Sequence, residues 1–372
     1  GAGLNYGSGV VMNRYSDYIN NLGGKVLLGC DGFVDEVYQI VAERHSLSDF
    51  TAMDKLRRFG ELIVERSDGG VGLEIVHKRR CEGGFAINTG RVAGMLGLRP
   101  KLAGLFGAKE LDPAFACFAD ICELISLGDP ALTLAFEFSD GKVLMSDLKT
   151  VANLTWQDFV DHFGEAKLKE LFEGIDILGL GYWSLTPDFD NLLKGFVSRY
   201  DDGAAPRRMF FDFADIKKKS TESFTASLEL ITGFNEKIPM VLSMNEHEVL
   251  ELFTRIGVPL PGKDPAAMPP ALEAARRKIQ LDELVVHTPA FAAASSAADG
   301  EDLALQETQS EVIRTAGAGD TFNGGYLCAS LGELSVKERL VIANAATAFF
   351  VTHATPPTRE ELIAQIGMAR DT

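Results

Sequence analysis

The sequence predicts an α/β fold with three layers, in which helices cover both faces of a mainly parallel β-sheet and a small β lid is attached. Short apolar runs that end in Gly, Asp or Asn alternate with longer amphipathic stretches along most of the 372 residues. This alternation is typical of βα units. The runs expected to form strands are 25–30, 101–107, 176–183, 208–214, 240–244 and 284–288. Because no repeat, low-complexity tract or clear linker divides the chain, we expect one domain over 1–372.

Helices are expected between these strands and at the end of the chain. One begins after Thr155, which forms a capping-box pattern with Asp158 and is followed by Phe159, Phe163 and Leu168 along one side. Two long helices are expected around 320–331 and 336–352, and a short one near 359–369. The proline-rich stretch 257–270 is expected to be a loop.

Two segments interrupt the alternation and predict the lid. The stretch 133–147 has two strand-like runs joined at Asp140-Gly141, a dipeptide that suits the positive φ angles of a tight hairpin. The stretch 36–82 carries a helix at about 51–66 and then the strand-like run LEIVHKRR. We therefore expect segments within about 36–82 and 131–152 to form a small β flap.

Composition excludes several classes of partner. The formal net charge is -17, and no long run of Lys or Arg is present, so nucleic acid and anionic membranes are not expected partners. No segment reaches the roughly 18 consecutive apolar residues of a membrane span. The five cysteines lack metal-type spacing and several lie in apolar stretches, which favours free thiols and a cytoplasmic protein.

The most informative motif is TAGAGDT at 315–321, between a strand-like stretch and the helical run FNGGYLCASLG. Small residues at a helix start let backbone N–H groups approach an anion, and the helix dipole adds positive potential there. A phosphate therefore suits this turn. The carboxylate of Asp320 can accept the proton of a hydroxyl that attacks the phosphate. The alternative is an ordinary helix start that Asp320 caps.

A second motif, EGGFAIN at 82–88, opens another expected helix. Paired glycines permit close approach by a ligand, and the Asn88 amide can donate to and accept from sugar hydroxyls. Asp35 follows the first strand, where α/β sheets place ligands. Asp31 is the competing choice. For either residue the alternative is an ordinary loop carboxylate with no role in binding.

A third motif, NEHE, follows the expected strand 240–244. Asn245 is placed to cap the next helix, and Glu248 can hold the water shell of a magnesium ion. A purely structural capping box of these two residues is an equal alternative.

Together the motifs GGFAIN, NEHE and TAGAGDTFNGG resemble those of the ribokinase (PfkB-type) carbohydrate kinases in order and position, over nearly the whole chain. The hairpin at 133–147 resembles their lid strands. The resemblance implies a ribokinase-like fold and a sugar kinase that moves the terminal phosphoryl group of a nucleotide to a hydroxyl. It also implies that Asp320 is the catalytic base, that Gly317, Ala318 and Gly319 form the anion hole, that Gly83, Gly84, Asn88 and Asp35 contact the sugar, and that Asn245 and Glu248 form the magnesium-phosphate motif.

The chain departs from the family pattern in its nucleotide region. Arg314 replaces the Asp that usually begins the last motif, so a monovalent-cation site there is in doubt, and its guanidinium suits nucleotide phosphates instead. LVVHTPAFAAA stands in place of the usual Thr-x-Gly-x-x-Gly loop and resembles the His-Thr segment of the ADP-dependent sugar kinases. FFDFAD similarly resembles that branch's His-x-Glu stretch, with Asp212 in place of Glu. The expected nucleotide ligands are Asn245, His287, Arg314 and Thr315, and the expected metal ligands are Glu248 and Asp212.

We therefore expect a Mg²⁺-dependent phosphotransferase that uses ATP, with ADP as the alternative donor and a sugar or sugar-like acceptor. A homodimer formed through the lid is a further expectation. A catalytically silent ligand-binding homologue is one rival, because the altered nucleotide loop and Arg314 would suit it. A dinucleotide-binding dehydrogenase is disfavoured, because its GxGxxG motif does not follow the first strand. The sequence there is GCDGFVD.

Overall fold

The centre of the molecule is a sheet that contains nine strands in the part of the chain described by the computed structural model, residues 8–200, 205–306, 309 and 311–368. From one edge to the other these are β14 (Gly300–Leu305), β13 (Phe291–Ser296), β12 (Glu283–His287), β11 (Met240–Asn245), β10 (Arg208–Asp212), β9 (Ile177–Leu180), β1 (Val26–Gly29), β5 (Lys101–Gly104) and β6 (Glu123–Ser126).

The sheet is mainly parallel, as the sequence predicts. Every neighbouring pair from β12 to β6 is parallel, and only β13 and β14 join in antiparallel fashion. Each of the six expected runs overlaps one of these strands. Strands β6, β13 and β14 were not predicted, because their short runs lack a clear alternation of apolar and polar residues.

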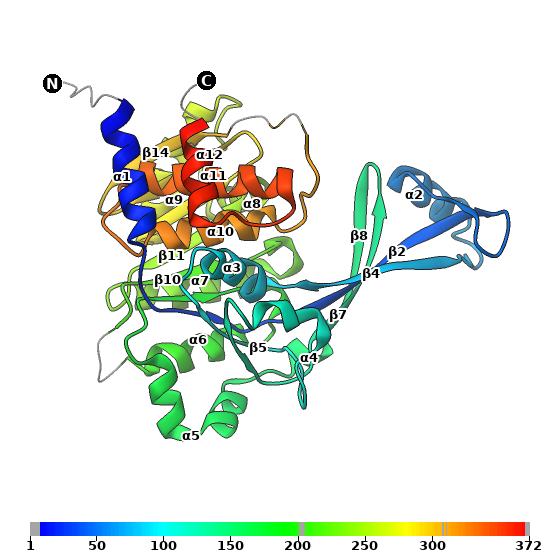
Figure 1. The fold of residues 1–372 in the computed structure, drawn as a ribbon, viewed down its shortest axis with the longest axis horizontal. Coiled ribbons are helices and arrows are strands. Elements are labelled where there is room, and N and C mark those ends of the chain that lie inside the picture. Colours follow the sequence, from blue (N-terminus) through cyan, green and yellow to red (C-terminus); the bar gives the residue numbers. More distant parts are fainter. Residues whose placement is uncertain (1–7, 201–204, 307–308, 310, 369–372) are drawn as a thin grey trace.

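Helices form a layer on each face of the sheet (Figure 1). One layer contains α1 (Ser8–Asn20), α3 (Phe85–Met95), α10 (Ala318–Ala329), α11 (Val336–His353) and α12 (Arg359–Met368). The other contains α5 (Trp156–Phe172), α6 (Phe189–Ser198), α7 (Thr221–Phe234), α8 (Glu246–Ile256) and α9 (Met268–Ile279). The predicted three-layer α/β/α arrangement is therefore confirmed. No helix within the described ranges is long and apolar enough to cross a membrane.

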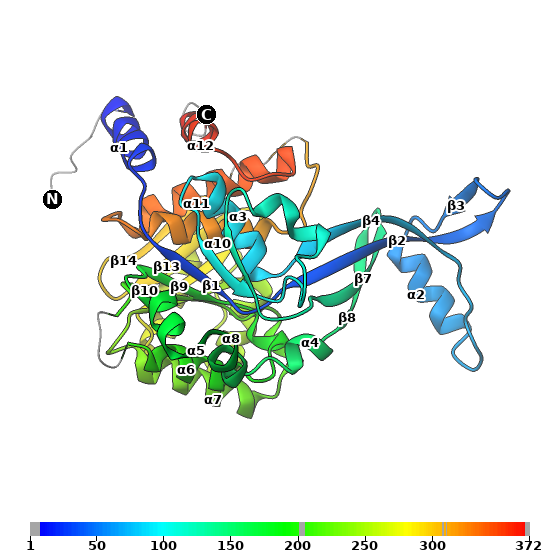
Figure 2. The same cartoon turned by 60° about the horizontal axis from the view of Figure 1, so that its bottom comes forward.

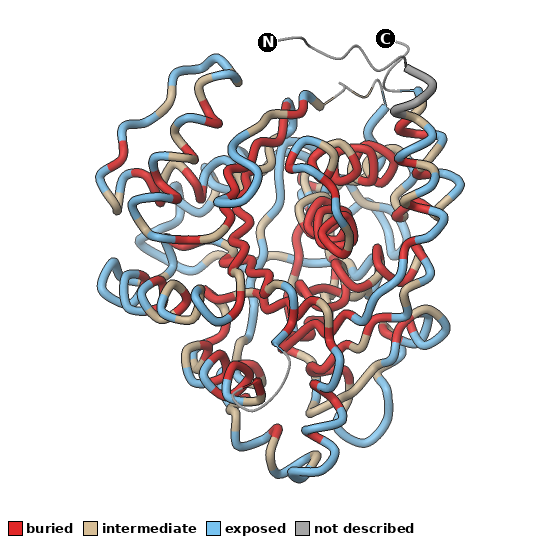
Figure 3. The backbone as a smooth tube through the Cα atoms, turned by 90° about the vertical axis from the view of Figure 1, so that its left-hand side faces the viewer, coloured by how far each residue is buried: buried red, intermediate tan, exposed pale blue. Residues whose placement is uncertain are grey.

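The strand side chains alternate between two cores. In β10, Met209 and Phe211 belong to the apolar cluster beneath α5–α9, whereas Phe210 belongs to the cluster beneath α3 and α10–α12. Since successive side chains of a strand point to opposite faces, a continuous apolar strand fills both cores at once. Figure 3 shows the resulting buried interior along the strands and the helices that cover them.

A separate, mixed sheet forms the lid. It contains β2 (Phe33–Arg44), β3 (Phe50–Ala52), β4 (Ile75–Gly83), β7 (Ala131–Phe138) and β8 (Gly141–Asp147), with the helices α2 (Leu56–Glu65) and α4 (Lys149–Ala152) in the same segments. Only the β2–β7 pair is parallel. The expected hairpin is present, but its turn is Ser139-Asp140, because Gly141 already pairs with Phe138 as the first residue of β8. Figures 1 and 2 show that the lid extends from the body as an arm, with α2 near its tip.

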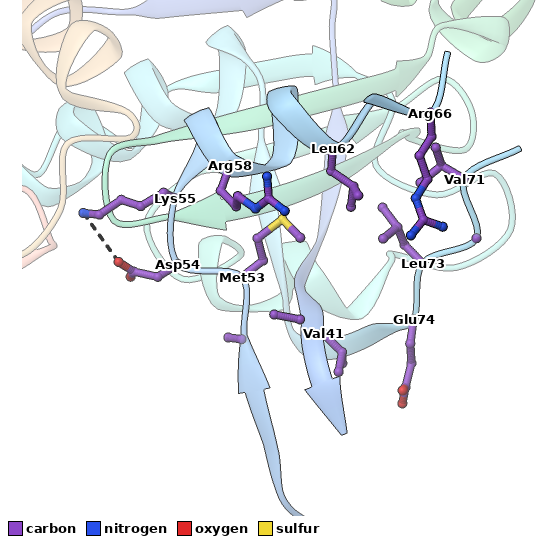
Figure 4. Close-up of a pocket in the computed structure, with 13 residues that line it drawn as sticks. Val41, Met53, Asp54, Lys55, Arg58, Leu62, Arg66, Val71, Leu73 and Glu74 are labelled. Atoms are coloured by element: carbon purple, nitrogen blue, oxygen red, sulfur yellow. Dashed lines mark ion pairs between the residues drawn. The ribbon is translucent and has the colours of Figure 1, made fainter. Parts of the chain in front are cut away.

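The lid has a cavity of its own, of about 550 Å³, between α2 and the lid strands. Figure 4 shows Leu62 and Arg58 of α2 on one side of this cavity and Met53 and Val41 on the other. None of the site residues expected from the sequence lines it. The cavity therefore marks loose packing of α2 and is separate from the motifs that carry chemistry.

Three local expectations need correction. The stretch 257–270 is not all loop, because α9 begins at Met268. Its first turn contains prolines, whose missing N–H groups would have had no acceptor within the helix. The lid helix begins at Leu56 and not at 51, because Phe50–Ala52 pairs with β2. The helix after Thr155 has its capping box, but Gly164 interrupts it with φ +66°.

The candidate active site

Polar side chains gather at one edge of the central sheet, where its parallel strands end. Asp31 follows β1, Tyr182 follows β9, and Asp212, Asn245 and His287 end β10, β11 and β12. The carboxyl ends of parallel strands meet at the same edge, and this edge is where open α/β sheets bind ligands. The first turns of α3 and α10 meet here as well, since Asn88 and Asp320 are hydrogen-bonded.

Asp320 lies in the first turn of α10 and is held by two side chains. Asn88 Nδ2 donates to its Oδ2 at 2.9 Å, and the Tyr182 hydroxyl lies 2.8 Å from both carboxyl oxygens. Asp320 is only 7% exposed. Burial and the nearby charge of Asp212 raise the pKa of Asp320 well above its usual range, while the bonds from Tyr182 and Asn88 oppose the rise. A buried carboxyl with a raised pKa suits a general base.

The turn before Asp320 has the geometry of an anion site. Gly317 precedes α10 with φ +88°, and Ala318 and Gly319 are the first residues of the helix. First-turn N–H groups have no acceptor within their own helix, which suits an anion, but here Ala318 N already donates to Thr315 O at 3.1 Å. The space beside Gly319 is tight, because a Cβ there would lie 3.0 Å from His287 Cε1.

A cavity of about 530 Å³ adjoins this turn. Ala318, Gly319 and Thr315 line it, together with Asn245 and His287. Three of the four expected nucleotide ligands thus face one cavity beside the helix start. Burial lowers the pKa of His287 to about 4, so its ring is neutral near pH 7. The sequence did not indicate the apolar part of the wall, which includes Phe322 and Val351.

The fourth expected nucleotide ligand, Arg314, points elsewhere. Its neighbours Val312 and Thr315 line the cavity, but Arg314 does not. Its Nε donates to Ala316 O at 3.0 Å, and its guanidinium carbon lies 5.5 Å from the centre of the Phe350 ring. The positive charge of Arg314 is the weakest of the influences that oppose the raised pKa of Asp35, which places its charge on the Asp35 side of the site.

The structure separates the two candidate aspartates at the first strand. Both oxygens of Asp31 accept backbone N–H groups at the start of α3, from Phe85 at 2.6 Å and Ala86 at 2.9 Å. Asp31 is therefore a helix cap. Asp35 stands at the root of the lid beside Gly83, where an added Cβ would lie 3.2 Å from its Oδ1. Burial raises the pKa of Asp35 to about 6, opposed by Thr133, Lys142 and Arg314.

Asn245 and Glu248 form the reciprocal capping box that was the structural alternative for this motif. Glu248 N donates to Asn245 Oδ1 at 3.0 Å, and Asn245 N donates to Glu248 Oε2 at 2.9 Å. Burial, and then the charge of Asp212, raises the pKa of Glu248 to about 8. Asp212 itself accepts from Asn323 Nδ2 and Ala214 N, each at 2.7 Å.

The two carboxyl groups fit a magnesium ion only in part. Their mutual repulsion would be relieved by a cation, and carboxylate oxygens are ligands that Mg²⁺ prefers. However, no group of three or more His, Cys, Asp or Glu side chains suited to a metal occurs among the described residues. An ion here would therefore keep several waters and rely on the nucleotide phosphates for its remaining contacts.

Tyr182 is the site residue that sequence reasoning missed. It lies within the expected strand 176–183, but the strand ends at Leu180, and Tyr182 is part of the turn that follows. The signal that could have identified it is its position, a polar side chain just beyond a buried strand.

Comparisons with known proteins agree with this geometry. Residues 17–368 match the family model described as prokaryotic ketohexokinase. A ketohexokinase from Haloferax volcanii is 27% identical over 346 residues, which is 92% of this chain and 90% of that protein.

Solved structures with the same fold include a putative ribokinase II from E. coli, with a TM-score of 0.63, 16% identity and coverage of 93% of this chain and 99% of that one. A nucleoside kinase from Methanocaldococcus jannaschii matches with a TM-score of 0.61, 14% identity and coverage of 93% and 98%. Ribokinase from Arabidopsis thaliana matches with a TM-score of 0.60, 15% identity and coverage of 92% and 98%. This ribokinase-like chain is a carbohydrate kinase that transfers a phosphoryl group to an alcohol, and it belongs to the prokaryotic ketohexokinase family.

Proposed function

We propose that the enzyme phosphorylates a hydroxyl of a ketohexose such as fructose, with ATP as the donor. The family match and the ketohexokinase relative support the choice of acceptor. The observation that carries the proposal is the Asp320 carboxyl at the start of α10, beside a cavity large enough for part of a nucleotide. Base and anion site thus adjoin the space for the donor.

In this proposal the sugar lies between the lid root and α3, with hydroxyls bonded to Asp35 and Asn88 and its ring close to Gly83 and Gly84. Asp320 removes the proton of the attacking hydroxyl. The amides of Gly317 and Gly319, joined by that of Ala318 once it leaves Thr315 O, stabilise the negative charge that develops on the phosphoryl oxygens.

The nucleotide is assigned to the cavity beside α10. Asn245, His287 and Thr315 face it, and the neutral His287 ring suits a hydrogen bond or a stacking contact with the donor. A magnesium ion held near Glu248 and Asp212 would neutralise phosphate charge. Positioning and charge neutralisation supply most of the rate in phosphoryl transfer.

The choice between ATP and ADP is tested by thermal unfolding with Mg²⁺ and each nucleotide. A donor at about 100 times its dissociation constant adds about 2.7 kcal/mol to stability. We expect ATP to raise the unfolding midpoint and to support turnover of fructose. A shift and turnover with ADP alone would indicate the ADP-dependent alternative, and no shift with either would favour a silent binding homologue.

The base assignment predicts that Asp320→Asn removes nearly all phosphoryl transfer while nucleotide affinity stays within about twofold. The amide is isosteric but cannot accept a proton, and loss of general-base catalysis costs about 10²- to 10⁴-fold. Steady-state kinetics and calorimetric titration with nucleotide provide the two measurements.

Asp264→Asn is the matched control for this experiment. Asp264 caps a short turn through Ala266 N and does not line the nucleotide cavity, so this variant should keep parental activity. Turnover by Asp320→Asn at the parental rate would reject the proposed function.

We also propose that two copies pair through their lids. Leu132, Leu144 and Met145 are large apolar residues that are 42–52% exposed on the lid strands, with Leu144 on one face of the lid sheet and the other two on the opposite face. The arm extends away from the body (Figure 2). Exposed apolar side chains on a projecting sheet favour association.

A further inference from the structure

The two oxygens of the Asp320 carboxyl receive unequal sets of hydrogen bonds. It lies 2.8 Å from each oxygen, whereas Asn88 Nδ2 reaches only Oδ2, at 2.9 Å. A phenol has a single proton, so Tyr182 shares it between the two oxygens. Oδ2 therefore receives one full donor, Asn88, and a share of the Tyr182 proton, whereas Oδ1 receives only a share of that proton. Oδ1 is the oxygen with the most free capacity to accept another hydrogen bond.

The backbone around Tyr182 holds this phenol in place. The Tyr182 carbonyl accepts Leu185 N at 3.0 Å and Thr186 Oγ1 at 2.9 Å. Its ring packs edge-on against Phe85, with the ring centres 6.2 Å apart. The preceding Gly181 lies so close to Phe85 that an added Cβ would be 2.4 Å from its Cγ. The side chain thus reaches Asp320 from a fixed turn at the end of β9.

The surroundings keep the phenol a donor. Burial, together with the charges of Asp320, Asp212 and Asp31, raises the pKa of Tyr182 well above its usual range. Tyr182 therefore remains protonated and cannot replace Asp320 as the base. The other groups that act on Asp320 are Asp212 from β10, Asp31 from the end of β1 and Asn88 from α3.

We propose that Tyr182 is a positioning residue for phosphoryl transfer, which orients the Asp320 carboxylate, keeps it ionised and leaves Oδ1 free for the hydroxyl of the acceptor. The proposal rests on the assignment of Asp320 as the base. In the step itself, the O–H bond of the acceptor breaks and its proton passes to Oδ1. The acceptor oxygen bonds to the terminal phosphorus, and the bond to the bridging oxygen breaks, with its electron pair remaining on the nucleotide. Tyr182 keeps its proton throughout.

The test is Tyr182→Phe, compared with Tyr200→Phe as the matched control. Tyr200 is a buried tyrosine whose hydroxyl has no hydrogen-bond partner among the residues that the structure describes, so its replacement removes the same atom outside the site. We expect Tyr182→Phe to lower kcat near neutral pH by about 10- to 100-fold, the range for a lost hydrogen bond to a charged group. Tyr200→Phe should stay within about twofold of the parent.

The pH profile separates positioning from a structural role. Without the Tyr182 bond the pKa of Asp320 rises, so the acid limb of kcat should move to higher pH and most of the lost rate should return in alkaline buffer. Nucleotide affinity, measured by calorimetric titration, should match that of the parent and establishes that the variant is folded.

Two results would overturn the proposal. One is a kcat for Tyr182→Phe within about twofold of the parent at every pH, and the other is an equal loss at every pH together with weakened nucleotide binding. These results are distinct from failure of the proposed function, which is recognised by activity that persists in Asp320→Asn.

Discussion

Arg314 differs from the other expected nucleotide ligands in the direction of its side chain. Asn245, His287 and Thr315 face the cavity beside α10, whereas Arg314 packs on Phe350 and its charge acts on Asp35. In an irregular segment, neighbouring residues can serve opposite sides of a site. Arg314 therefore has a different predicted role, in which its positive charge helps to keep Asp35 ionised for the sugar hydroxyls.

This role predicts that Arg314→Met raises the KM for the acceptor by about fivefold, which corresponds to about 1 kcal/mol. The KM for the nucleotide should remain unchanged. Because loss of the cation raises the pKa of Asp35 from about 6, the effect should be largest at mildly acidic pH. Steady-state kinetics with each substrate varied at pH 6 and pH 8 provide the measurement.

Thr315→Val is the counterpart, because Thr315 lines the nucleotide cavity and should affect the nucleotide KM alone. A raised nucleotide KM in Arg314→Met, with the acceptor KM unaltered, would instead indicate that Arg314 contacts the nucleotide phosphates.

At the residue scale, the sequence was most informative where chemistry is local. Asp320 and the residues before it lie in one turn, so a single motif predicts both the proposed base and the proposed anion site. Asp31 and Asp35 could not be separated, because the choice depends on the start of α3, which lies more than 50 residues away in the chain. Tyr182 was missed for the same reason, since its partner Asp320 is 138 residues distant.

At the element scale, the start of α3 depends on Asp31. Its carboxyl accepts two N–H groups of the first turn and is 1% exposed. Burial raises the pKa of Asp31 from 3.8 to about 7. The folded state therefore binds more protons than the unfolded state between about pH 4 and pH 7, and the stabilising effect of this group is lost as pH rises through that window.

Asp31→Asn is accordingly predicted to destabilise the protein, by an amount that depends on pH. One oxygen becomes an NH₂ group that cannot accept, which leaves a buried N–H unsatisfied at a cost of about 1–3 kcal/mol. The neutral side chain also removes the penalty of ionising Asp31, so the loss should be larger at pH 5 than at pH 7.5. Denaturant unfolding at both pH values measures the difference.

Groups far from residue 31 titrate alike in the two proteins and cancel in this comparison, whereas the pKa of Asp320 is lowered by loss of the Asp31 charge. A cost that is equal at both pH values, or that grows with pH, would mean that Asp31 is already ionised at pH 5.

Elements with local signals were predicted well. The capping boxes of Thr155 with Asp158 and of Asn245 with Glu248 both begin helices. Strand β2 was not predicted, although it is 12 residues long. Its residues change from buried to exposed as the strand leaves the body and enters the lid, so neither an alternating nor a continuous apolar pattern runs through it.

At the scale of the whole molecule, the order of βα units predicted the parallel sheet, and the hairpin predicted the lid. The direction of the lid was not predictable, because it depends on long-range pairings such as β2 with β7. One such contact joins lid and body, where Arg80 of β4 bonds Asp112 at 2.8 Å and also pairs with Glu36 of β2 at 3.1 Å.

The two faces of the lid sheet differ, and this difference indicates how copies would pair. Met145 is paired with Leu134, which belongs to the apolar cluster beneath α2. Leu144 is paired with Ala135 and lies on the opposite face, the one that carries Asp35. Because α2 covers the face of the lid sheet that carries Leu134 and Met145, two lids are expected to pair through the opposite face, which carries Leu144.

Lid pairing therefore predicts that Leu144→Glu dissociates the dimer and that the neighbouring Met145→Glu does not. The two side chains are 51% and 52% exposed in one chain, so exposure alone would not distinguish them. A symmetric interface loses Leu144 twice, and each burial contributes about 1.5–3 kcal/mol, so the dissociation constant should rise by at least about 100-fold. Sedimentation velocity over a range of concentrations measures this dissociation constant.

Since Asp35 shares the face of Leu144, the monomeric variant should also show a raised acceptor KM. A monomeric parent at all concentrations, or dissociation by Met145→Glu alone, would contradict this arrangement.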